Sequence, residues 1–239
     1  MWPQPVAQPE AVLTPFASRK SGWQITLDNA ASAQTPVLHQ FIRQRYADTY
    51  QAHINHFLPL MLASFTTSGV QGVLGLQPGI SGQFFVEQYF DTSIEQQISK
   101  ATGQTVDRRQ VIETGNLASM KGGSQRLFIV LTELLYQAGF NWVCFTATPQ
   151  VQALLQRLGF APELLGPADP ARLPDCGQQW GSYYQNQPNV LAGDVHKARE
   201  TLIKNEIATR LLQEHADELA LAVSVLTSAG AHTASARMR

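Results

Sequence analysis

The chain has few cysteines, little net charge and no long apolar run. Its two cysteines, Cys144 and Cys176, are too few for a disulfide scaffold, and Cys144 lies in an apolar segment, as a core thiol would. A net charge of −1 over 239 residues argues against a general nucleic-acid binder. No apolar run approaches the roughly 18 residues that span a bilayer, so no transmembrane segment is predicted.

Several signatures of catalysis and targeting are also missing. The six histidines are scattered, and none pairs with a cysteine or an aspartate at metal-ligand spacing, so no metal site is predicted. The chain contains no Gly-x-Ser-x-Gly elbow. It begins Met-Trp-Pro-Gln-Pro, without the basic and then apolar pattern of a secretory signal. We therefore expect a cytoplasmic protein.

The most informative stretch of the sequence is the segment 108–160. Its first apolar run, 111–117, predicts a strand, and Gly122-Gly123 predicts the turn that follows. Leucines from Ser124 onward share one face of a helix. The uninterrupted apolar run 142–145 then predicts a strand that is buried on both faces. Together these elements form a βαβ unit with a right-handed crossover.

Two features of this unit carry chemistry. The Gly-Gly turn places free backbone N–H groups at a helix start, which favours phosphate binding. Glu113 interrupts an apolar strand just before that turn, and desolvation would raise its pKa toward that of a useful general base. The plain alternatives remain open: two glycines before a helix can be a turn only, and a strand glutamate can simply face solvent.

The flanking segments complete an α/β (α+β) domain at 21–194, between a Pro-rich, unstructured segment at 1–20 and an amphipathic helix at 195–228. That helix is expected to pack on the domain or on a second copy of the chain, to form a homodimer, and to be dispensable for chemistry. Residues 229–239 are expected to lack structure. Further strands are predicted at 23–27, 72–76, 83–90, 180–184 and 190–192, and further helices from Thr35-Pro36, at 91–99 and at 149–158.

Five short runs carry a family resemblance: ETGNLAS, GFNWVCFTAT, LLQRLGF, WGSYY and AGD. Together they resemble the thermostable hemolysin family from about Gln44 to Asp194. The family name implies lysis of red cells, without implying a mechanism.

A more distant resemblance is to the GCN5-related N-acyltransferase (GNAT) fold, a mixed central sheet flanked by helices. It implies that Glu113 is the base, that the turn at Gly122, Gly123 and Ser124 binds the donor phosphates, and that the next strand splays away. The fold's usual glycine motif is only partly met. In many members a tyrosine five residues before the final Phe of the next helix is the general acid. Leu155 stands there in this chain, and Tyr183 or Tyr184 is the substitute.

Within that fold, the order of features is similar to that of the acyl-homoserine-lactone synthases. Their helix with arginine and aromatic residues corresponds to Arg45, Tyr46 and Tyr50. Asn116 stands where they carry an arginine after the glutamate, a departure that argues against a lactone product and leaves acyl transfer to a small amine. A solvated face is the plain alternative for the basic residues around Arg45.

The leading hypothesis is an acyltransferase that moves a fatty acyl group from coenzyme A or acyl carrier protein to an amino-acid-like amine, with no permanently bound cofactor. Glu113 accepts the proton, while Asn116 and Ser119 orient the substrate. The Leu117 backbone N–H polarises the thioester carbonyl. The further residues expected at the site are Tyr183 for catalysis and Arg45, Tyr46, Tyr50 and Thr146 for the substrate. The alternatives are a membrane-active lytic protein and a catalytically inactive binding module.

Overall fold

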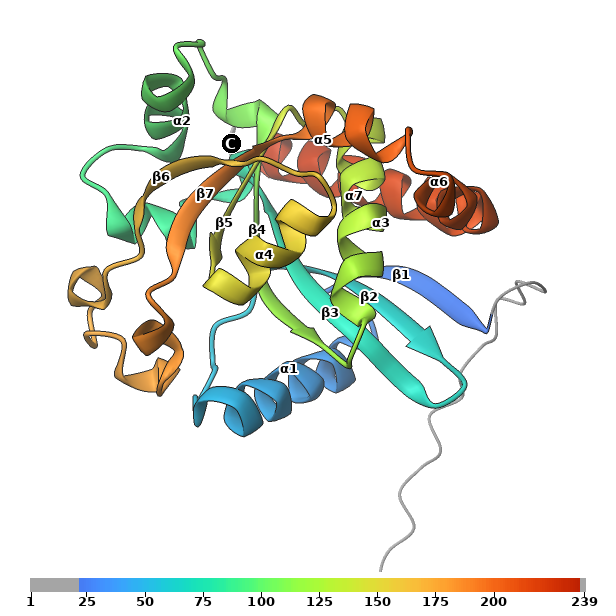
Figure 1. Cartoon of the computed structure of the whole chain (residues 1–239), viewed down its shortest axis with the longest axis horizontal. Coiled ribbons are helices and arrows are strands. Elements are labelled where there is room, and N and C mark those ends of the chain that lie inside the picture. The colour runs from blue at the N-terminus through green and yellow to red at the C-terminus, as the bar shows by residue number, and fades with distance from the viewer. Residues whose placement is uncertain (1–21, 237–239) are drawn as a thin grey trace, which may run out of the picture.

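The computed structural model describes residues 22–236, with side chains described through Ala229. Seven strands form one sheet in the order β1-β2-β3-β4-β5-β7-β6 (Figure 1). All neighbouring strands are antiparallel except β4 and β5, which are parallel. The strands are β1 Trp23–Asn29, β2 Leu60–Thr66, β3 Gly69–Pro78, β4 Val111–Ser119, β5 Trp142–Ala147, β6 Glu163–Pro167 and β7 Asn189–Asp194. The predicted mixed sheet is confirmed.

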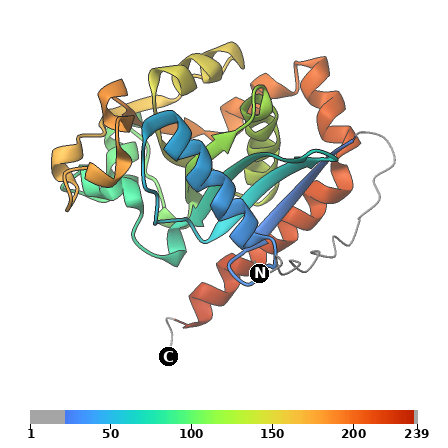
Figure 2. The same cartoon turned by 90° about the horizontal axis from the view of Figure 1, so that it is seen from below.

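Helices cover both faces of this sheet. The first helix, α1, crosses one face, while α3 and α7 lie on the other (Figures 1 and 2). Pro36 near the start of α1 and Pro149 at the start of α4 supply a backbone angle suited to a first helical turn. The α-helices are α1 Thr35–Tyr50, α2 Ile94–Thr102, α3 Gly123–Gln137, α4 Pro149–Arg157, α5 Val195–Leu202, α6 Glu206–Glu214 and α7 Ala216–Ala236.

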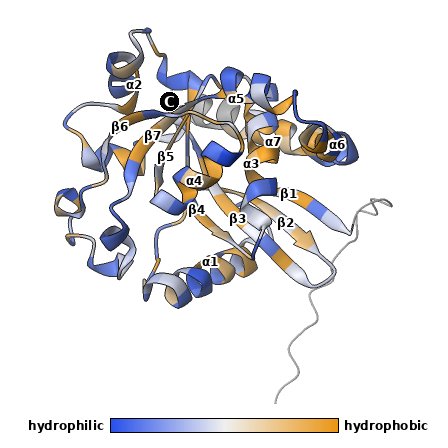
Figure 3. Cartoon of the chain, viewed as in Figure 1, coloured by the Kyte–Doolittle hydropathy of each residue, from blue (hydrophilic) through white to orange (hydrophobic). Residues whose placement is uncertain are grey.

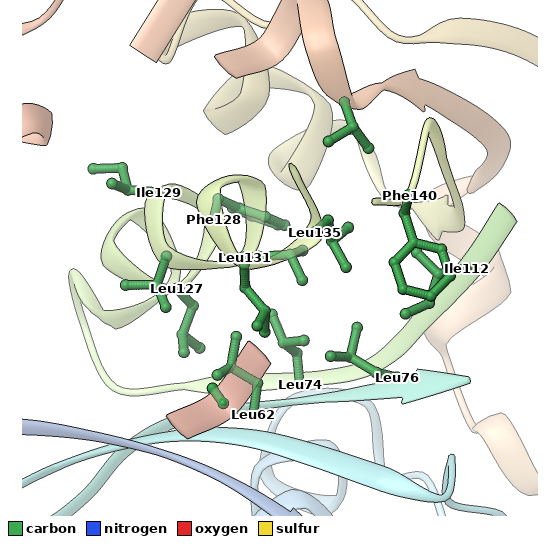
Figure 4. Close-up of a cluster of buried hydrophobic side chains, with 14 of the residues drawn as sticks. Leu62, Leu74, Leu76, Ile112, Leu127, Phe128, Ile129, Leu131, Leu135 and Phe140 are labelled. Atoms are coloured by element: carbon green, nitrogen blue, oxygen red, sulfur yellow. The ribbon is translucent and has the colours of Figure 1, made fainter. Parts of the chain in front are cut away.

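Alternation along the strands divides the core between the two faces. In β2, Leu60 and Leu62 point to α3, whereas Met61 and Ala63 point to α1. The α3 side holds the largest cluster, in which Leu127 is fully buried, as Figure 4 shows. Hydrophobic residues are concentrated along α3, α7 and the adjoining strands (Figure 3).

The sheet splits between β4 and β5. These strands pair only where Val111–Glu113 meets Trp142–Cys144. Beyond Glu113, β4 stays with β3 and β5 stays with β7. A register shift between Val73 and Gly75 and the left-handed φ of 51° at Asn116 mark the point where β4 turns away. One edge of β4 therefore has no strand partner after Glu113.

Two of the predicted strands are wrong. The segment 83–90 forms a 3₁₀ helix, η2, at Phe85–Tyr89, and 180–184 lies in short 3₁₀ turns. Both segments are rich in aromatic residues, which favour strands, but long-range contacts override that propensity. Carboxylates hold the backbone of η2, and Gly181 packs its backbone directly against the Tyr50 carbonyl.

The strand β2, Leu60–Thr66, was not predicted.

The predictions for the two ends of the chain also need attention. The single C-terminal helix expected at 195–228 is three helices, because Asn205 caps α6 and His215 ends it. Helix α7 runs on to Ala236, into the tail expected to lack structure. The expected unstructured segment 1–20 lies outside the described residues.

Candidate functional site

A cavity lies where β4 and β5 diverge. The split admits side chains from both faces of the sheet, so α1, η2 and the turn around Trp180 meet α3 and α4 here. The lining consists of Tyr46, Tyr50, His56, Leu58, Leu74, Phe85, Val86, Glu113, Thr114, Gly115, Asn116, Leu117, Phe128, Phe145, Thr146, Thr148, Val151, Trp180 and Tyr183. We call it the splay cavity.

A second cavity lies on the α3 side of the sheet. Helices α3, α4 and α5 and strand β5 enclose it, and most of its exposed surface is apolar. Leu131, Leu135 and Leu155 are among its lining residues. It shares Thr114, Phe128 and Phe145 with the splay cavity, and these three residues form the partition between the two spaces. We call it the apolar chamber.

Glu113 lines the splay cavity and is 2% exposed. Its Oε2 accepts the backbone N–H of Phe85 at 2.7 Å, and its Oε1 accepts that of Val86 at 2.9 Å. Burial raises the pKa of the Glu113 carboxyl to about 7, although the two N–H donors act in the opposite direction. This buried carboxyl can therefore gain and lose a proton near neutral pH.

Glu87, close by in η2, provides the contrast. Burial acts to raise the pKa of its carboxyl, but Arg108 and the backbone N–H groups of Phe84 and Ile94 outweigh burial and hold that pKa below its ordinary value. No basic side chain forms a hydrogen bond or ion pair with Glu113 among the described residues. Glu87 is thus a structural anion, whereas Glu113 is free to titrate.

Asn116 lines the cavity, but its amide is already engaged. Oδ1 accepts the backbone N–H of Leu58 at 3.0 Å, and Nδ2 donates to the His56 carbonyl at 3.1 Å. These two bonds fasten the segment before β2 across β4. The structure thus indicates that Asn116 positions the cavity wall.

Tyrosines surround the opposite side of the cavity. The Tyr183 hydroxyl donates to Thr146 Oγ1 at 3.3 Å, and burial raises the pKa of Tyr183. The Tyr184 and Tyr89 hydroxyls lie 2.5 Å apart, and burial raises the pKa of Tyr184 to about 12. Of these three, only Tyr183 lines the cavity. Tyr183 keeps its proton at neutral pH, and its hydroxyl acts as a hydrogen-bond donor in the lining.

The glycine turn does not line either cavity. Gly122 has a φ of 83°, and α3 starts at Gly123. A Cβ on Gly123 would lie 2.5 Å from the Gln71 carbonyl, so this glycine is needed for packing. The hydroxyls of Ser119 and Ser124 lie 2.6 Å apart beside the turn. The structure thus separates these residues from Glu113.

The expected substrate residues divide in the same way. Tyr46, Tyr50 and Thr146 line the splay cavity, whereas Arg45 does not. No sequence pattern pointed to Phe85 as a site residue, because it lies in a segment wrongly predicted as a strand. Trp180 also lines the cavity, and it begins the run WGSYY, which carries part of the family resemblance and was predicted as a strand.

Two kinds of feature are absent from the described residues. Within 22–236, no three His, Cys, Asp or Glu residues gather as a metal site. Over the same residues, no helix is long and apolar enough to cross a membrane.

Comparisons with known proteins identify a family and a fold. The family model described as thermostable hemolysin matches residues 29–199. No curated protein matches the chain. The acyl-homoserine-lactone synthase LasI is similar at 11% identity, with a TM-score of 0.50, over 72% of this chain and 90% of that one.

Two further solved structures are similar. One is FeeM, an N-acyl amino acid synthase from uncultured soil microbes, at 12% identity and a TM-score of 0.50, over 75% of this chain and 94% of that one. The other is BjaI, a coenzyme-A-dependent acyl-homoserine-lactone synthase bound to SAM and isopentyl-CoA. It is 14% identical, with a TM-score of 0.51, over 84% of this chain and 98% of that one. The predicted GNAT-like fold is confirmed.

Proposed function

The chain belongs to the thermostable hemolysin family, and we propose that it is an N-acyltransferase that moves a fatty acyl group from a thioester to a small amine. The observation that carries this proposal is Glu113, a buried carboxyl with a pKa of about 7, at the wall of a cavity that opens between two splayed strands. The fold supports it, because its solved neighbours are named as acyl-transferring synthases.

In the proposed reaction, the amine nitrogen attacks the thioester carbonyl carbon. The new C–N bond forms as the C–S bond breaks, and the products are an amide and a free thiol. Glu113 accepts the proton that the nitrogen loses, directly or through a water. The departing thiolate takes up a proton from Glu113 or from water, and Tyr183, which burial keeps protonated, donates a hydrogen bond to it.

The acyl chain would occupy the apolar chamber. Its wall residues Leu131, Leu135 and Leu155 give an alkyl chain a water-free environment. Phe128 and Phe145 lie between this chamber and Glu113. A chain bound there would leave its thioester in the splay cavity, within reach of the base.

The carrier part of the donor would follow the unpaired edge of β4. The Leu117 backbone N–H, beyond the last pair with β5, would polarise the thioester carbonyl. The first turn of α3, from Ser124 onward, would hold the phosphates through its backbone N–H groups, whereas the Gly123 N–H already donates to the Met120 carbonyl. Coenzyme A and a phosphopantetheine carrier protein share these groups, so both remain candidate donors.

The test is an assay of purified protein against a panel of acyl-coenzyme A and acyl-carrier-protein donors, each combined with a panel of amines. Mass spectrometry should detect an amide and an equal amount of free thiol. Hydrolysis of the thioester without amide, or no turnover with any pair, would contradict the proposal.

Direct membrane lysis is the second candidate, because the family name implies it. The structure gives it little support, since Leu219, Ala222 and Leu226 of α7 are buried in the main core. Leakage from liposomes without any acyl donor separates the two functions. We expect no leakage from the folded protein alone.

A further inference from the structure

The charges around the splay cavity limit what the acceptor amine carries. Glu113 is the one carboxylate in the lining, and no lysine or arginine lines the cavity among the described residues. Arg108, in the 3₁₀ turn just before β4, is held by Glu87 and Glu95 through its guanidinium. His56, which is exposed, is the one histidine in the lining.

Aromatic rings form the wall on the α1 side of this cavity. The Trp180 ring centroid lies 5.6 Å from that of Phe85 and 5.5 Å from that of Tyr183. Tyr50 lies 5.3 Å from Tyr183 and 5.8 Å from Tyr46. Phe85 connects this wall to the carboxylate, because its own N–H donates to Glu113. We call these five residues the aromatic wall.

This combination suits a cation and disfavours an anion. Ring faces attract an ammonium group, and a buried carboxylate adds direct Coulomb attraction. A free carboxylate on the acceptor would enter the same low-dielectric space as Glu113 without a basic side chain to pair with. The free-energy cost of binding therefore falls on the carboxylate of an amino acid, while binding of its amine is favoured.

We infer that the acceptor is an amine without a free carboxylate, either an arylalkyl amine or an amino ester or amide. It enters as the ammonium ion, releases one proton to solvent and attacks as the neutral amine, whose second proton Glu113 accepts. The inference rests on the proposed acyl transfer and narrows its acceptor from an amino-acid-like amine to one whose acid group is absent or masked. The apolar part of that acceptor packs on the aromatic wall, with its nitrogen toward Glu113.

Matched acceptor pairs test the inference in the same assay. Tyramine is compared with tyrosine, tryptamine with tryptophan, and leucine methyl ester with leucine, each with one acyl-coenzyme A. We expect kcat/KM to be at least about tenfold higher for the member without a carboxylate, equivalent to about 1.4 kcal/mol. Equal or faster acylation of the free amino acids would overturn the inference and leave the proposed function standing.

Binding gives a readout that does not need turnover. Calorimetric titration of the same pairs should show tighter binding of the member that lacks a free carboxylate. Equal affinity within a pair overturns the inference, whatever the activity. If no acceptor yields an amide, the proposed function is contradicted. The titration still decides whether the cavity prefers acceptors without a free carboxylate.

A positive charge added at the rim should remove much of the preference. His56→Arg places a guanidinium on the cavity lining, and we expect it to raise the relative kcat/KM for the free amino acid about tenfold. His53→Arg is the matched control, because His53 is also exposed but does not line the cavity. If folded His56→Arg kept the wild-type preference, that result would count against a cavity that selects its acceptor by charge.

Discussion

Two glutamates near one 3₁₀ helix have opposite electrostatic environments. Glu87 is paired with Arg108, whereas Glu113 accepts only the backbone N–H groups of Phe85 and Val86. The same kind of side chain therefore serves as a fixed anion in one place and as a titrating group in the other. This difference at the scale of single residues is the basis of the proposed chemistry.

The raised pKa of Glu113 predicts how stability changes with pH. Folding raises this pKa from its ordinary value of 4.5 to about 7, so the folded state binds the proton more tightly than the unfolded state. The stabilising contribution is fully present below about pH 4.5 and is lost as pH rises through about 7. Urea unfolding of the wild type and of Glu113→Gln across this range should show the fall in the wild type only. The same slope in both proteins would assign it to other groups.

The Arg108 network should be important for stability. Arg108 binds the carbonyls of Gly79 and Gly82 as well as Glu87, which is 7% exposed. Arg108→Met leaves that carboxylate without its cation, and we expect a loss of about 3 kcal/mol in the free energy of unfolding. Arg109→Met is the control, since the Arg109 side chain is 78% exposed, and it should change stability by no more than about 0.5 kcal/mol. Similar losses in both variants would contradict this.

At the scale of elements, the start of α3 combines packing with the proposed phosphate site. Gly123 cannot test phosphate binding cleanly, because any side chain there meets the Gln71 carbonyl. Ser124 is a better probe, since it is in the first turn of α3 and only partly buried.

Ser124→Glu separates folding from donor binding. A negative charge at a helix start stabilises the helix by roughly 0.3–1 kcal/mol but repels phosphate. We expect an unchanged or slightly raised Tm together with at least about tenfold weaker coenzyme A binding by calorimetry, about 1.4 kcal/mol. Ser124→Gln is the uncharged control. Normal affinity in folded Ser124→Glu would place the phosphates elsewhere.

The sequence predicts an element correctly where its structure is determined by residues within that element. The unit from β4 to α4 follows from apolar runs, a helical leucine face and two glycines. The strand predicted at 83–90 was wrong because Glu87, within the segment, accepts the backbone N–H of Phe84, and Glu113 of β4 accepts that of Phe85 from outside the segment. The aromatic wall was only partly predicted, since Trp180 meets Tyr46 and Phe85 through tertiary contacts that no local period records.

At the scale of the whole molecule, the C-terminal helices complete the core. Leu219, Ala222 and Leu226 join Trp23 and Ile25 in one buried cluster. That the C-terminal segment is dispensable for chemistry remains a prediction, and removal of the segment would expose this core. We propose that α5 belongs to the site, because it helps enclose the apolar chamber, and that α6 and α7 stabilise the domain.

One helix provides both a test and its control. Leu219 is 2% exposed and Leu221 is 56% exposed, both on α7. We expect Leu219→Ala to lower the free energy of unfolding by about 2–5 kcal/mol, and Leu221→Ala to change it by less than about 0.5 kcal/mol. A large effect of Leu221→Ala instead would mean that this face is covered, for example by a second copy of the chain, and comparison of the variants by analytical ultracentrifugation would show it.

The most direct test of the central claim is the turnover of Glu113→Gln per folded molecule. Glutamine fits the same space but cannot accept the proton, and it leaves one of the two backbone N–H groups without its acceptor. The turnover number, the Tm and the fraction folded are measured on one preparation of each protein. We expect turnover to fall about 10²–10⁴-fold at neutral pH, with the protein still folded and the acyl donor still bound. The wild-type rate should also rise with pH through about 7, as Glu113 ionises. A folded variant with a lowered Tm and wild-type turnover would show that Glu113 only anchors η2, and would contradict the mechanism.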